Sequence, residues 1–432
     1  MSLYSELQPN GYLPRIADTL VEGALANFGG VEVCGPRWCG KSWTSMAHGR
    51  SITRVDESVP IFTDDPAIAL LGERPHVVDE WQDVPAIWNT VRHAIDDAAN
   101  APGQFLLTGS SAPLERKGEA SRHSGAGRIA RVKMSTMTQY EMGTAPGGVS
   151  LEGLFEGRFT PSVHESSLGD LAERICRGGW PVLASRNDAA YGHIIEQYLE
   201  ALFERSIPRA NLSPVLARRI AASLARNYAT SATLSTIGTD AAADEARVPT
   251  DETVSAYLDE FARNYFLELL PGWDAPVRSK SRLRTKPKRY LADPSLAAAL
   301  LGVDAARLLE DAQLLGLLFE SLVIHDLAVF ARCLPGYTQQ SLRYYADADG
   351  LEVDLVIELS DGRWAGLEIK LGESKVEHGL RNLRRLRNKV SANLAARNPE
   401  PAFMAVVLGR GIAARYVQDE KAYVIPFDLL EP

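Results

Sequence analysis

The feature that most constrains the fold of this chain is a short glycine-rich motif near the N-terminus. Gly35-Pro-Arg-Trp-Cys-Gly40-Lys41-Ser42 matches the pattern G-x-x-x-x-G-K-[ST]. It follows an apolar run, residues 31–34, that predicts a strand, and it opens a helix predicted over 40–47. This order of strand, loop and helix is the context in which the pattern binds phosphate. We therefore expect a nucleotide site on an α/β fold with a parallel sheet.

The residue types of this phosphate-binding loop (P-loop) predict its chemistry. The glycines let backbone N–H groups close around phosphate oxygens, and Lys41 sets an ammonium against the β and γ phosphates. The Ser42 hydroxyl coordinates Mg²⁺, so ATP and Mg²⁺ are the expected cofactors. The residues predicted to bind the nucleotide here are Gly35, Pro36, Arg37, Gly40, Lys41, Ser42 and Trp43.

A second apolar run ends in two acids, Asp79 and Glu80. If Val77 and Val78 end a buried strand, Asp79 lies near the metal and Glu80 near the attacking water, as a Walker B motif requires. Without the P-loop, the same acids would be interpreted as surface residues after a strand. A third run ends at residues 107–111, where Thr108 or Ser110 can sense the γ-phosphate, although a simple turn has the same pattern.

Arg128 follows a segment rich in glycine, serine and charge, residues 116–127. In that position its guanidinium can act on the transferring phosphoryl group, either in the same subunit or in a neighbouring one. The alternative is an ordinary surface arginine.

Length and composition bound the remaining possibilities. At about 100 to 200 residues per domain, 432 residues predict two to four domains. The 45% hydrophobic and 23% charged residues exclude a disordered or fibrous chain, and the net charge of −9 excludes a surface that coats nucleic acid throughout. The four cysteines and eight histidines show no disulfide framework and no zinc spacing.

The sequence also predicts a cytoplasmic protein. The most apolar stretch, Leu314 to Ala331, is interrupted by Glu320, His325 and Asp326, which argues against a membrane span. The first 18 residues lack the basic and apolar regions of a signal peptide.

Apolar periodicity divides the chain further. Strands are expected at 31–34, 55–62, 76–79 and 104–108, with a helix at 87–99. Residues 168–232 and 250–270 are expected to be helical, with Ile194 and Tyr265 among the apolar positions of their stripes. The last section is expected to be a separate α/β unit, with helices through residue 331, strands at 342–346, 352–359, 363–371 and 403–408, and a helix at about 375–397.

Carboxylates in this last section suggest a second site. Asp354 lies on one predicted strand, and Glu368 and Lys370 project from one face of the next, because strand side chains repeat every two residues. Asp354 and Glu368 can bind Mg²⁺ while Lys370 orients water for attack on a phosphodiester, and Glu320 can supply a third acid. A solvated hairpin with a Glu/Lys ladder fits the pattern equally well.

Two segments are strongly basic. Residues 278–289 carry seven positive charges and no acid, which suits a wing lying against DNA phosphates or, alternatively, a solvated connector. A second group, without interleaved aromatic residues, comprises Arg381, Arg384, Arg385, Arg387 and Lys389.

Together these motifs resemble a bacterial and archaeal family of AAA-type P-loop ATPases that carry a C-terminal restriction-endonuclease-like domain of unknown function. The matching positions are Tyr12 to Arg15, Gly35 to Ser42, Val78 to Gln82 with Pro85, Leu107 to Ser111, Gly127-Arg128, Gly178 to Pro181, Asp293-Pro294, Glu352 to Asp354 and Glu368 to Lys370. Trp38, Cys39 and Trp43 depart from the usual P-loop pattern but leave the phosphate-binding atoms in place.

The resemblance implies four parts: a P-loop ATPase core over residues 1–145, a helical lid over 146–210, a winged-helix-like module over 211–290 and a PD-(D/E)xK-like α/β domain over 291–432. It also implies that Asp354, Glu368 and Lys370 form an intact metal site. It does not imply a settled biological role.

Three functions compete on this sequence. The leading one is a cytosolic ATPase whose nucleotide state controls a DNA-associated, nuclease-like domain. The second is a non-cleaving regulator that uses the C-terminal domain as a docking surface. A small-molecule phosphotransferase ranks last, because the sequence offers no recognisable acceptor pocket.

Overall fold

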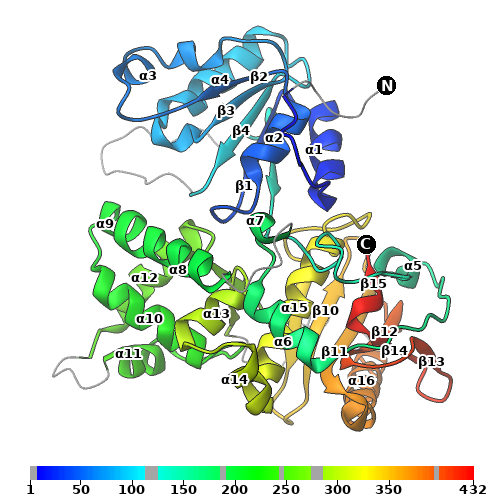
Figure 1. The fold of residues 1–432 in the computed structure, drawn as a ribbon. Helices are drawn as coiled ribbons and strands as arrows, with labels where there is room; N and C mark the ends of the chain where they lie inside the picture. Colours follow the sequence, from blue (N-terminus) through cyan, green and yellow to red (C-terminus); the bar gives the residue numbers. More distant parts are fainter. Residues whose placement is uncertain (1–6, 112–124, 185–190, 243–247, 274–285, 394–397) are drawn as a thin grey trace. The chain divides into compact units, whose positions relative to one another are not determined.

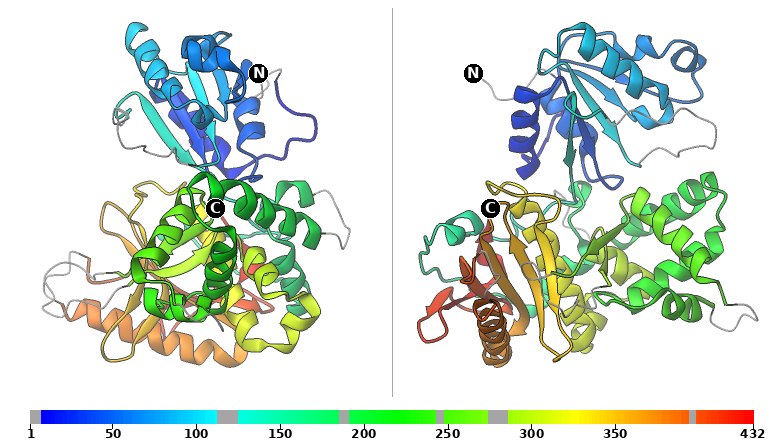
Figure 2. Two further views of the ribbon diagram at one scale, coloured as in Figure 1. Left: turned by 90° about the vertical axis from the view of Figure 1, so that its left-hand side faces the viewer. Right: turned by 180° about the vertical axis from the view of Figure 1, so that it is seen from behind.

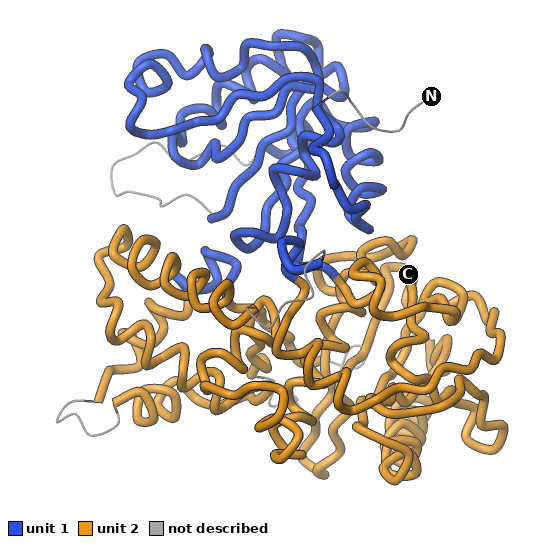
Figure 3. Tube along the Cα trace, viewed as in Figure 1, with its two compact units in different colours: residues 1–137, 180–185, 259–266 blue, residues 138–179, 186–258, 267–432 orange. Residues whose placement is uncertain are grey.

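The computed structural model describes residues 7–111, 125–184, 191–242, 248–273, 286–393 and 398–432 (Figure 1, Figure 2). The chain divides into two compact units (Figure 3). Unit 1 comprises residues 1–137, 180–185 and 259–266, and unit 2 comprises the remainder. The division into four parts expected from the sequence remains a prediction.

Unit 1 is built on a five-stranded parallel sheet with the strand order β2-β3-β4-β1-β5. Its strands are β1 (Gly30–Cys34), β2 (Ser51–Arg54), β3 (His76–Asp79), β4 (Phe105–Gly109) and β5 (Ile129–Lys133). Because all the strands run the same way, the segments that follow β1, β3 and β4 gather at one edge of the sheet.

Helices cover both faces of this sheet. Val31 and Val33 of β1 pack in one apolar cluster with α1 (Ile16–Asn27), whereas Leu107 of β4 packs in another with α4 (Ala86–Asp97). Strand side chains alternate between the two faces, so these short, fully buried strands serve both clusters. This two-sided burial explains why the strands appear in the sequence as continuous apolar runs.

Two expectations for unit 1 were wrong or incomplete. Residues 55–62, expected to form a strand, instead lead into α3 (Pro60–Asp64). Pro60 lies at the start of that helix, where its fixed φ is compatible with helix and its missing N–H costs nothing. The strand that pairs with β3 is β2, which lies just before this segment in the sequence. The edge strand β5 was not predicted.

Unit 2 contains a six-stranded mixed sheet with the order β13-β14-β12-β11-β10-β9. Its strands are β9 (Leu342–Ala346), β10 (Glu352–Glu358), β11 (Trp364–Gly372), β12 (Phe403–Arg410), β13 (Arg415–Val417) and β14 (Ala422–Pro426). Strands β9, β10 and β11 pair antiparallel, and β11, β12 and β14 pair parallel. The four strand segments predicted here are confirmed to within two residues.

Two helices lie along this sheet (Figure 1). The apolar side of α16 (Val376–Ser391) packs in one cluster with Val353, Val356 and Val406. The other long helix, α15 (Ala312–Ala331), is apolar enough to cross a membrane by length and composition, with a mean hydropathy of 1.9. Its apolar window is 67% buried inside the protein, as expected for a core helix.

A run of helices precedes this sheet in the sequence. It comprises α5 (Leu151–Phe155), α6 (Leu168–Arg177), α7 (Pro181–Ala184), α8 (Tyr191–Ala201), a π-helical turn (Leu202–Ser206), α9 (Ile207–Arg209), α10 (Pro214–Arg226), α11 (Leu234–Ala242) and α12 (Asp251–Arg263). On α8 the buried residue is Ile195 rather than the expected Ile194. The helix expected over 250–270 ends at Arg263, and the antiparallel pair β7 (Leu267–Leu270) and β8 (Lys288–Leu291) follows it.

Two more helices, α13 (Pro294–Leu301) and α14 (Ala305–Glu310), connect β8 to α15. A short parallel pair joins β6 (Val149–Ser150) to β15 (Leu430–Glu431). The Ser150 hydroxyl also donates to the Pro432 carbonyl at 2.6 Å. Unit 2 therefore closes by pairing segments about 280 residues apart in sequence.

Candidate functional site

The P-loop connects β1 to α2 (Lys41–His48). Gly35 has a φ of +152°, and a Cβ there would lie 2.2 Å from the Met134 carbonyl, so only glycine fits. Gly40 has a φ of +103° at the N-terminus of α2. The Lys41 ammonium donates to the Pro36 carbonyl at 2.8 Å and is buried within the loop. The expected strand–loop–helix is therefore present, with Lys41 turned into the loop.

The residues predicted to bind Mg²⁺ are adjacent in the structure. The Ser42 hydroxyl donates to Asp79 Oδ1 at 2.8 Å, across the ends of β1 and β3. Thr108, at the end of β4, donates to the same carboxylate oxygen. A hydroxyl and a carboxylate are the hard oxygen ligands that Mg²⁺ prefers, so Ser42 and Asp79 fit this ion.

Glu80 is held beside this pair by its own contacts. Its φ is +57°, and its backbone N–H donates to Thr108 Oγ1 at 3.2 Å. Its carboxylate accepts from Ser110 Oγ at 3.1 Å and from the Gln82 amide. Both candidate γ-phosphate sensors thus contact an acid: Thr108 contacts Asp79 and Glu80, and Ser110 contacts Glu80. The role of Gln82 was missed from the sequence, although it lies only two residues from Glu80.

The other P-loop side chains are more open. Trp43 is 46% exposed and Trp38 is 44% exposed, whereas Arg37 is half-buried. Nucleotide binding by Pro36, Arg37 and Trp43 remains a prediction.

Arg128 lies at the opposite edge of the same sheet. Its carbonyl accepts from Gly30 N at 3.0 Å, at the start of β1, whereas the P-loop follows the end of β1. Five strand residues at about 3.3 Å each separate these edges by roughly 16 Å. Its guanidinium pairs with Asp96 of α4 at 2.5 Å and lowers the pKa of that acid. In the structure described here, Arg128 thus lies away from the P-loop of its own chain and is paired with Asp96. Its action on a phosphoryl group, in the same or a neighbouring subunit, remains a prediction, and an ordinary surface arginine remains the alternative.

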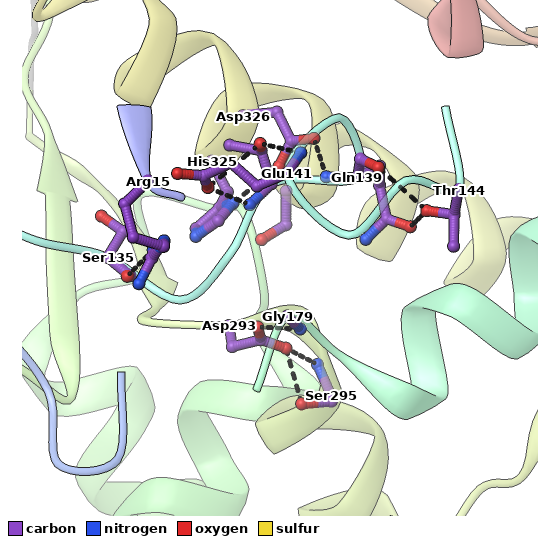
Figure 4. A network of polar contacts seen from close by, with 12 residues as sticks. Arg15, Ser135, Gln139, Glu141, Thr144, Gly179, Asp293, Ser295, His325 and Asp326 are labelled. Atoms are coloured by element: carbon purple, nitrogen blue, oxygen red, sulfur yellow. Dashed lines mark hydrogen bonds and ion pairs between the residues drawn. The ribbon is translucent and has the colours of Figure 1, made fainter. Parts of the chain in front are cut away.

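Two of the family motifs meet in unit 2 (Figure 4). The Asp293 carboxylate accepts from Gly179 N at 2.9 Å and from Ser295 N and Oγ at 2.9 and 2.6 Å. Gly178 has a φ of +70°, and a Cβ there would lie 2.4 Å from Ser295 Oγ and 2.5 Å from Asp293 Oδ1. The Gly178-Gly179 pair and the Asp293-Pro294 motif therefore contact each other directly.

Figure 4 also shows a buried pair that the sequence did not indicate. His325 Nδ1 lies 2.8 Å from Asp326 Oδ1, and Asp326 Oδ2 accepts from Gln139 N at 2.8 Å. Burial lowers the pKa of His325, but the hydrogen bond and charge of Asp326 outweigh burial and raise it. The pair fixes the turn after Thr138 to α15.

The predicted carboxylate site of unit 2 is assembled on β10 and β11. The register that sets Leu355 opposite Leu367 brings Asp354 beside Glu368. Lys370 Nζ donates to Asp354 Oδ2 at 3.0 Å and contacts Glu368 Oε2 as an ion pair without hydrogen-bond geometry. Burial and then the charge of Asp354 raise the pKa of Glu368 to about 8. The structure therefore brings Asp354, Glu368 and Lys370 together.

Glu320 on α15 joins this cluster through residues that the sequence did not connect to it. It accepts from Tyr290 OH at 2.7 Å and from Lys288 Nζ at 3.1 Å, and Lys288 also contacts Glu352 at 2.6 Å. Burial and then the charge of Asp354 raise the pKa of Glu320 to about 7. Another unpredicted contact comes from Asn382 of α16, which donates to Glu368 Oε1 at 3.1 Å.

The cluster thus combines four carboxylates with two ammonium groups. Over the part of the chain that the structure describes, no three His, Cys, Asp or Glu side chains are gathered as a metal ion requires. Lys370 instead supplies the positive charge between Asp354 and Glu368. Binding of a divalent cation by Asp354, Glu368 and Glu320 remains a prediction.

The basic segment 278–289 is described only from Lys286 onward. Lys288 is buried against Glu320 and Glu352, and Arg289 donates to the Ala232 carbonyl at 2.5 Å. Lys288 is therefore paired inside unit 2 and not available to DNA phosphates, which corrects the prediction for this residue, whereas Arg289 is half-buried and DNA contact by the rest of the segment remains a prediction. Residues 278–285 lie outside the described residues. On α16, Arg384 pairs with Glu420 and Lys389 with Asp347 and Asp349.

Comparison with known families matches three successive segments of the chain. Residues 29–143 match the model of an AAA domain, 168–307 match a domain of unknown function (DUF8612), and 315–429 match another (DUF4143). Residues 29–143 therefore form an AAA-type P-loop ATPase domain, which confirms that part of the predicted fold and supports ATP binding. Binding of Mg²⁺ remains a prediction.

Among solved structures, the chain is similar to the Walker-type ATPase PABY2304 of Pyrococcus abyssi, at 14% identity and a TM-score of 0.40 over 69% of this chain and 99% of that one. It is also similar to a variant of the RuvB protein of Thermotoga maritima, at 17% identity and a TM-score of 0.27 over 58% of this chain and 88% of that one.

Two curated relatives are more informative about the family. The uncharacterized proteins Rv2008c of Mycobacterium tuberculosis and Mb2031c of Mycobacterium bovis are each 30% identical to this chain over 363 residues. The alignment covers 82% of this chain and 73% of each relative. The chain therefore belongs to the family of these two mycobacterial proteins.

Proposed function

We propose that the chain hydrolyses ATP and that its nucleotide state controls a nuclease-like, DNA-associated C-terminal domain in the cytoplasm. The observation that carries the hydrolysis proposal is the linked set of Ser42, Asp79, Thr108 and Glu80. Thr108 bonds both acids, so the metal-binding and water-orienting groups are fixed relative to each other.

In this mechanism the P-loop amides and Lys41 bind the phosphates, and Ser42 and Asp79 hold Mg²⁺, which would neutralise charge on the β and γ oxygens. Glu80 orients the attacking water and accepts its proton. In the state described here, the carboxylate of Glu80 accepts from Ser110 and Gln82. Both of these bonds end on Oε2, so the other carboxylate oxygen, Oε1, is the one that would accept from the attacking water.

The test compares three variants in a phosphate-release assay. Lys41→Ala should lose most nucleotide affinity or all turnover, whereas Glu80→Gln should keep affinity near wild type and lower kcat at least about a hundredfold. Glu73→Gln, an exposed acid ahead of β3, is the matched control and should equal wild type. Equal turnover by wild type and Lys41→Ala would exclude this function.

The nuclease-like proposal rests on the cluster of Asp354, Glu368 and Lys370. Two adjacent, nearly buried carboxylates repel each other unless a cation lies between them. Asp354 and Glu368 would hold a divalent cation there, which when bound would supply activation of a water for attack on a phosphodiester. Lys370, beside both carboxylates, would orient that water.

The alternative is a non-cleaving regulator in which Lys370 permanently neutralises the acids and the domain is a docking surface. Calorimetry with Mn²⁺ and a DNA-nicking assay, with and without ATP, separate the two. Asp354→Ala and Lys370→Ala should abolish nicking, and Glu377→Gln, which is 93% exposed on α16, is the control. If the wild-type protein neither binds Mn²⁺ nor nicks DNA, the docking-surface alternative is favoured.

A further inference from the structure

The segment ahead of α1 makes contacts with the P-loop that the proposed reaction does not yet use. Arg15 is 7% exposed. Its Nη1 donates to the Cys39 carbonyl at 2.6 Å, and its Nη2 donates to the Ser135 carbonyl at 3.0 Å. Cys39 lies within the P-loop and Ser135 follows β5, the strand beside β1. One guanidinium therefore ties the P-loop to the neighbouring strand (Figure 4 shows Arg15 and Ser135).

The segment that carries Arg15 is itself fixed to α1 and α2. Asp18 Oδ2 accepts from Arg15 N at 2.8 Å, and Asp18 Oδ1 accepts from Tyr12 OH at 2.5 Å. His48, at the end of α2, lies 3.1 Å from the same Asp18 oxygen, and Tyr12 OH lies 3.0 Å from Thr44 Oγ1. Arg15 is therefore held at both its backbone and its side chain.

The bond to Cys39 fixes the direction of one particular amide. A trans peptide is planar, so its C=O and the N–H of the next residue point in opposite directions. Because Arg15 holds the Cys39 carbonyl on its own side, the Gly40 N–H points away from Arg15. A Cβ on Gly40 would lie 3.2 Å from Arg15 Nη1, which confirms that Arg15 covers one side of this residue.

The charge of Arg15 adds to this orientation. A guanidinium hydrogen bond to a carbonyl is stronger than one between neutral groups, and it polarises the peptide so that its N–H donates better. Backbone N–H groups of a P-loop are its phosphate donors. Lys41 bonds a second carbonyl of the loop, that of Pro36, at 2.8 Å.

We propose that Arg15 is a positioning residue of the ATPase, which sets the Cys39–Gly40 peptide so that its N–H faces the β-phosphate of the bound nucleotide. This inference rests on the proposed nucleotide function and assigns the Tyr12-to-Arg15 motif a role in it. Arg15 does not touch the nucleotide. It acts through the P-loop backbone on ATP and ADP alike, because both carry the β-phosphate.

The experiment measures ADP affinity by calorimetry and steady-state ATP turnover in the full chain. Arg15→Met should weaken ADP binding at least tenfold and raise KM for ATP by a similar factor. Its binding stoichiometry and kcat should stay within about threefold of wild type. Arg15→Lys keeps the positive charge but lacks the two-pronged guanidinium that reaches two carbonyls. Its ADP affinity should therefore lie between those of wild type and Arg15→Met.

Arg74→Met is the matched control, because Arg74 also donates to a backbone carbonyl, Leu70 at 2.8 Å, but precedes β3 at the opposite edge of the sheet. It should bind ADP as wild type does. A purely structural role for Arg15 would reduce the active fraction while the remaining protein kept wild-type affinity, and that result would overturn the inference. If Arg15→Met fails to fold, wild-type affinity in Arg15→Lys would overturn it as well. Wild type that binds no ADP would instead contradict the nucleotide function.

Discussion

The contact between Gly178 and Asp293 allows a sharp test, because a single methyl group should break it. Gly178 has φ +70° and ψ 178°, a backbone region that essentially only glycine adopts and that costs other residues about 1 to 3 kcal/mol. In Gly178→Ala the new Cβ would also lie 2.4 Å from Ser295 Oγ and 2.5 Å from Asp293 Oδ1. Both atoms belong to buried groups that bond each other, so neither can move without losing a hydrogen bond.

The expected loss is the sum of these two effects. Removal of one buried hydrogen bond to a charged group costs about 1.5 to 3 kcal/mol, so Gly178→Ala should destabilise unit 2 by about 2.5 to 6 kcal/mol. At roughly 2 °C per kcal/mol for a unit of this size, the calorimetric transition of unit 2 should fall by roughly 5 to 12 °C.

Gly157→Ala is the matched control for backbone strain alone. Gly157, also in unit 2, has φ +72°, but a Cβ added there would meet nothing within 4 Å, so its substitution should cost about 1 kcal/mol. The difference between the two variants reports the collision with Asp293 and Ser295 together with any extra backbone strain at Gly178. Equal transition temperatures for the two variants would refute the reasoning that Asp293 and Ser295 hold this turn rigidly.

Three further predictions concern charged groups. Arg128→Ala should lower kcat at least tenfold and leave nucleotide affinity unchanged. If Arg128 serves a neighbouring subunit, a mixture of the Arg128→Ala and Lys41→Ala proteins should regain turnover. A mixture whose rate is only the sum of the two separate rates would contradict action between subunits. Lys288→Met should destabilise unit 2 by about 3 to 5 kcal/mol in urea unfolding, because Glu320 loses its buried partner, and adding Glu320→Gln should recover part of this loss. DNA affinity should fall steeply with salt, and neutralising Arg282 and Arg284 should flatten that slope, whereas salt-independent binding would leave only the connector interpretation for the basic segment.

Several elements were predictable because a local rule determines them. The glycine positions of the P-loop and the apolar runs of β1, β3 and β4 are short-range features, and the structure has them where the sequence predicted. The run at 55–62 misled because its apolar residues suit a strand, whereas Pro60 favours a helix start. The edge strand β5 escaped notice because only Ile129 and Val132 of its five residues are buried, so it forms no continuous apolar run.

The candidate sites were predictable only in part, for a different physical reason. Asp354, Glu368 and Lys370 lie on paired strands, so side-chain alternation alone brought them together. The density of positive charge around Lys288 predicted DNA contact, but charge density carries no information about which side chains are buried. The partner of Lys288, Glu320, lies 32 residues away on another element, and only the folded structure reveals the pair.

The pairing of β15 with β6 bears on how the protein is synthesised. The sheet of unit 1 needs no residue beyond Lys133, so it can form while the ribosome is still translating unit 2. Strand β6, by contrast, waits for Leu430 and Glu431, and until they emerge its backbone donors and acceptors lack their partner strand. Translation therefore imposes an order in which the sheet of unit 1 can form first, whereas β6 of unit 2 finds its partner strand only after residues 430–431 have been synthesised.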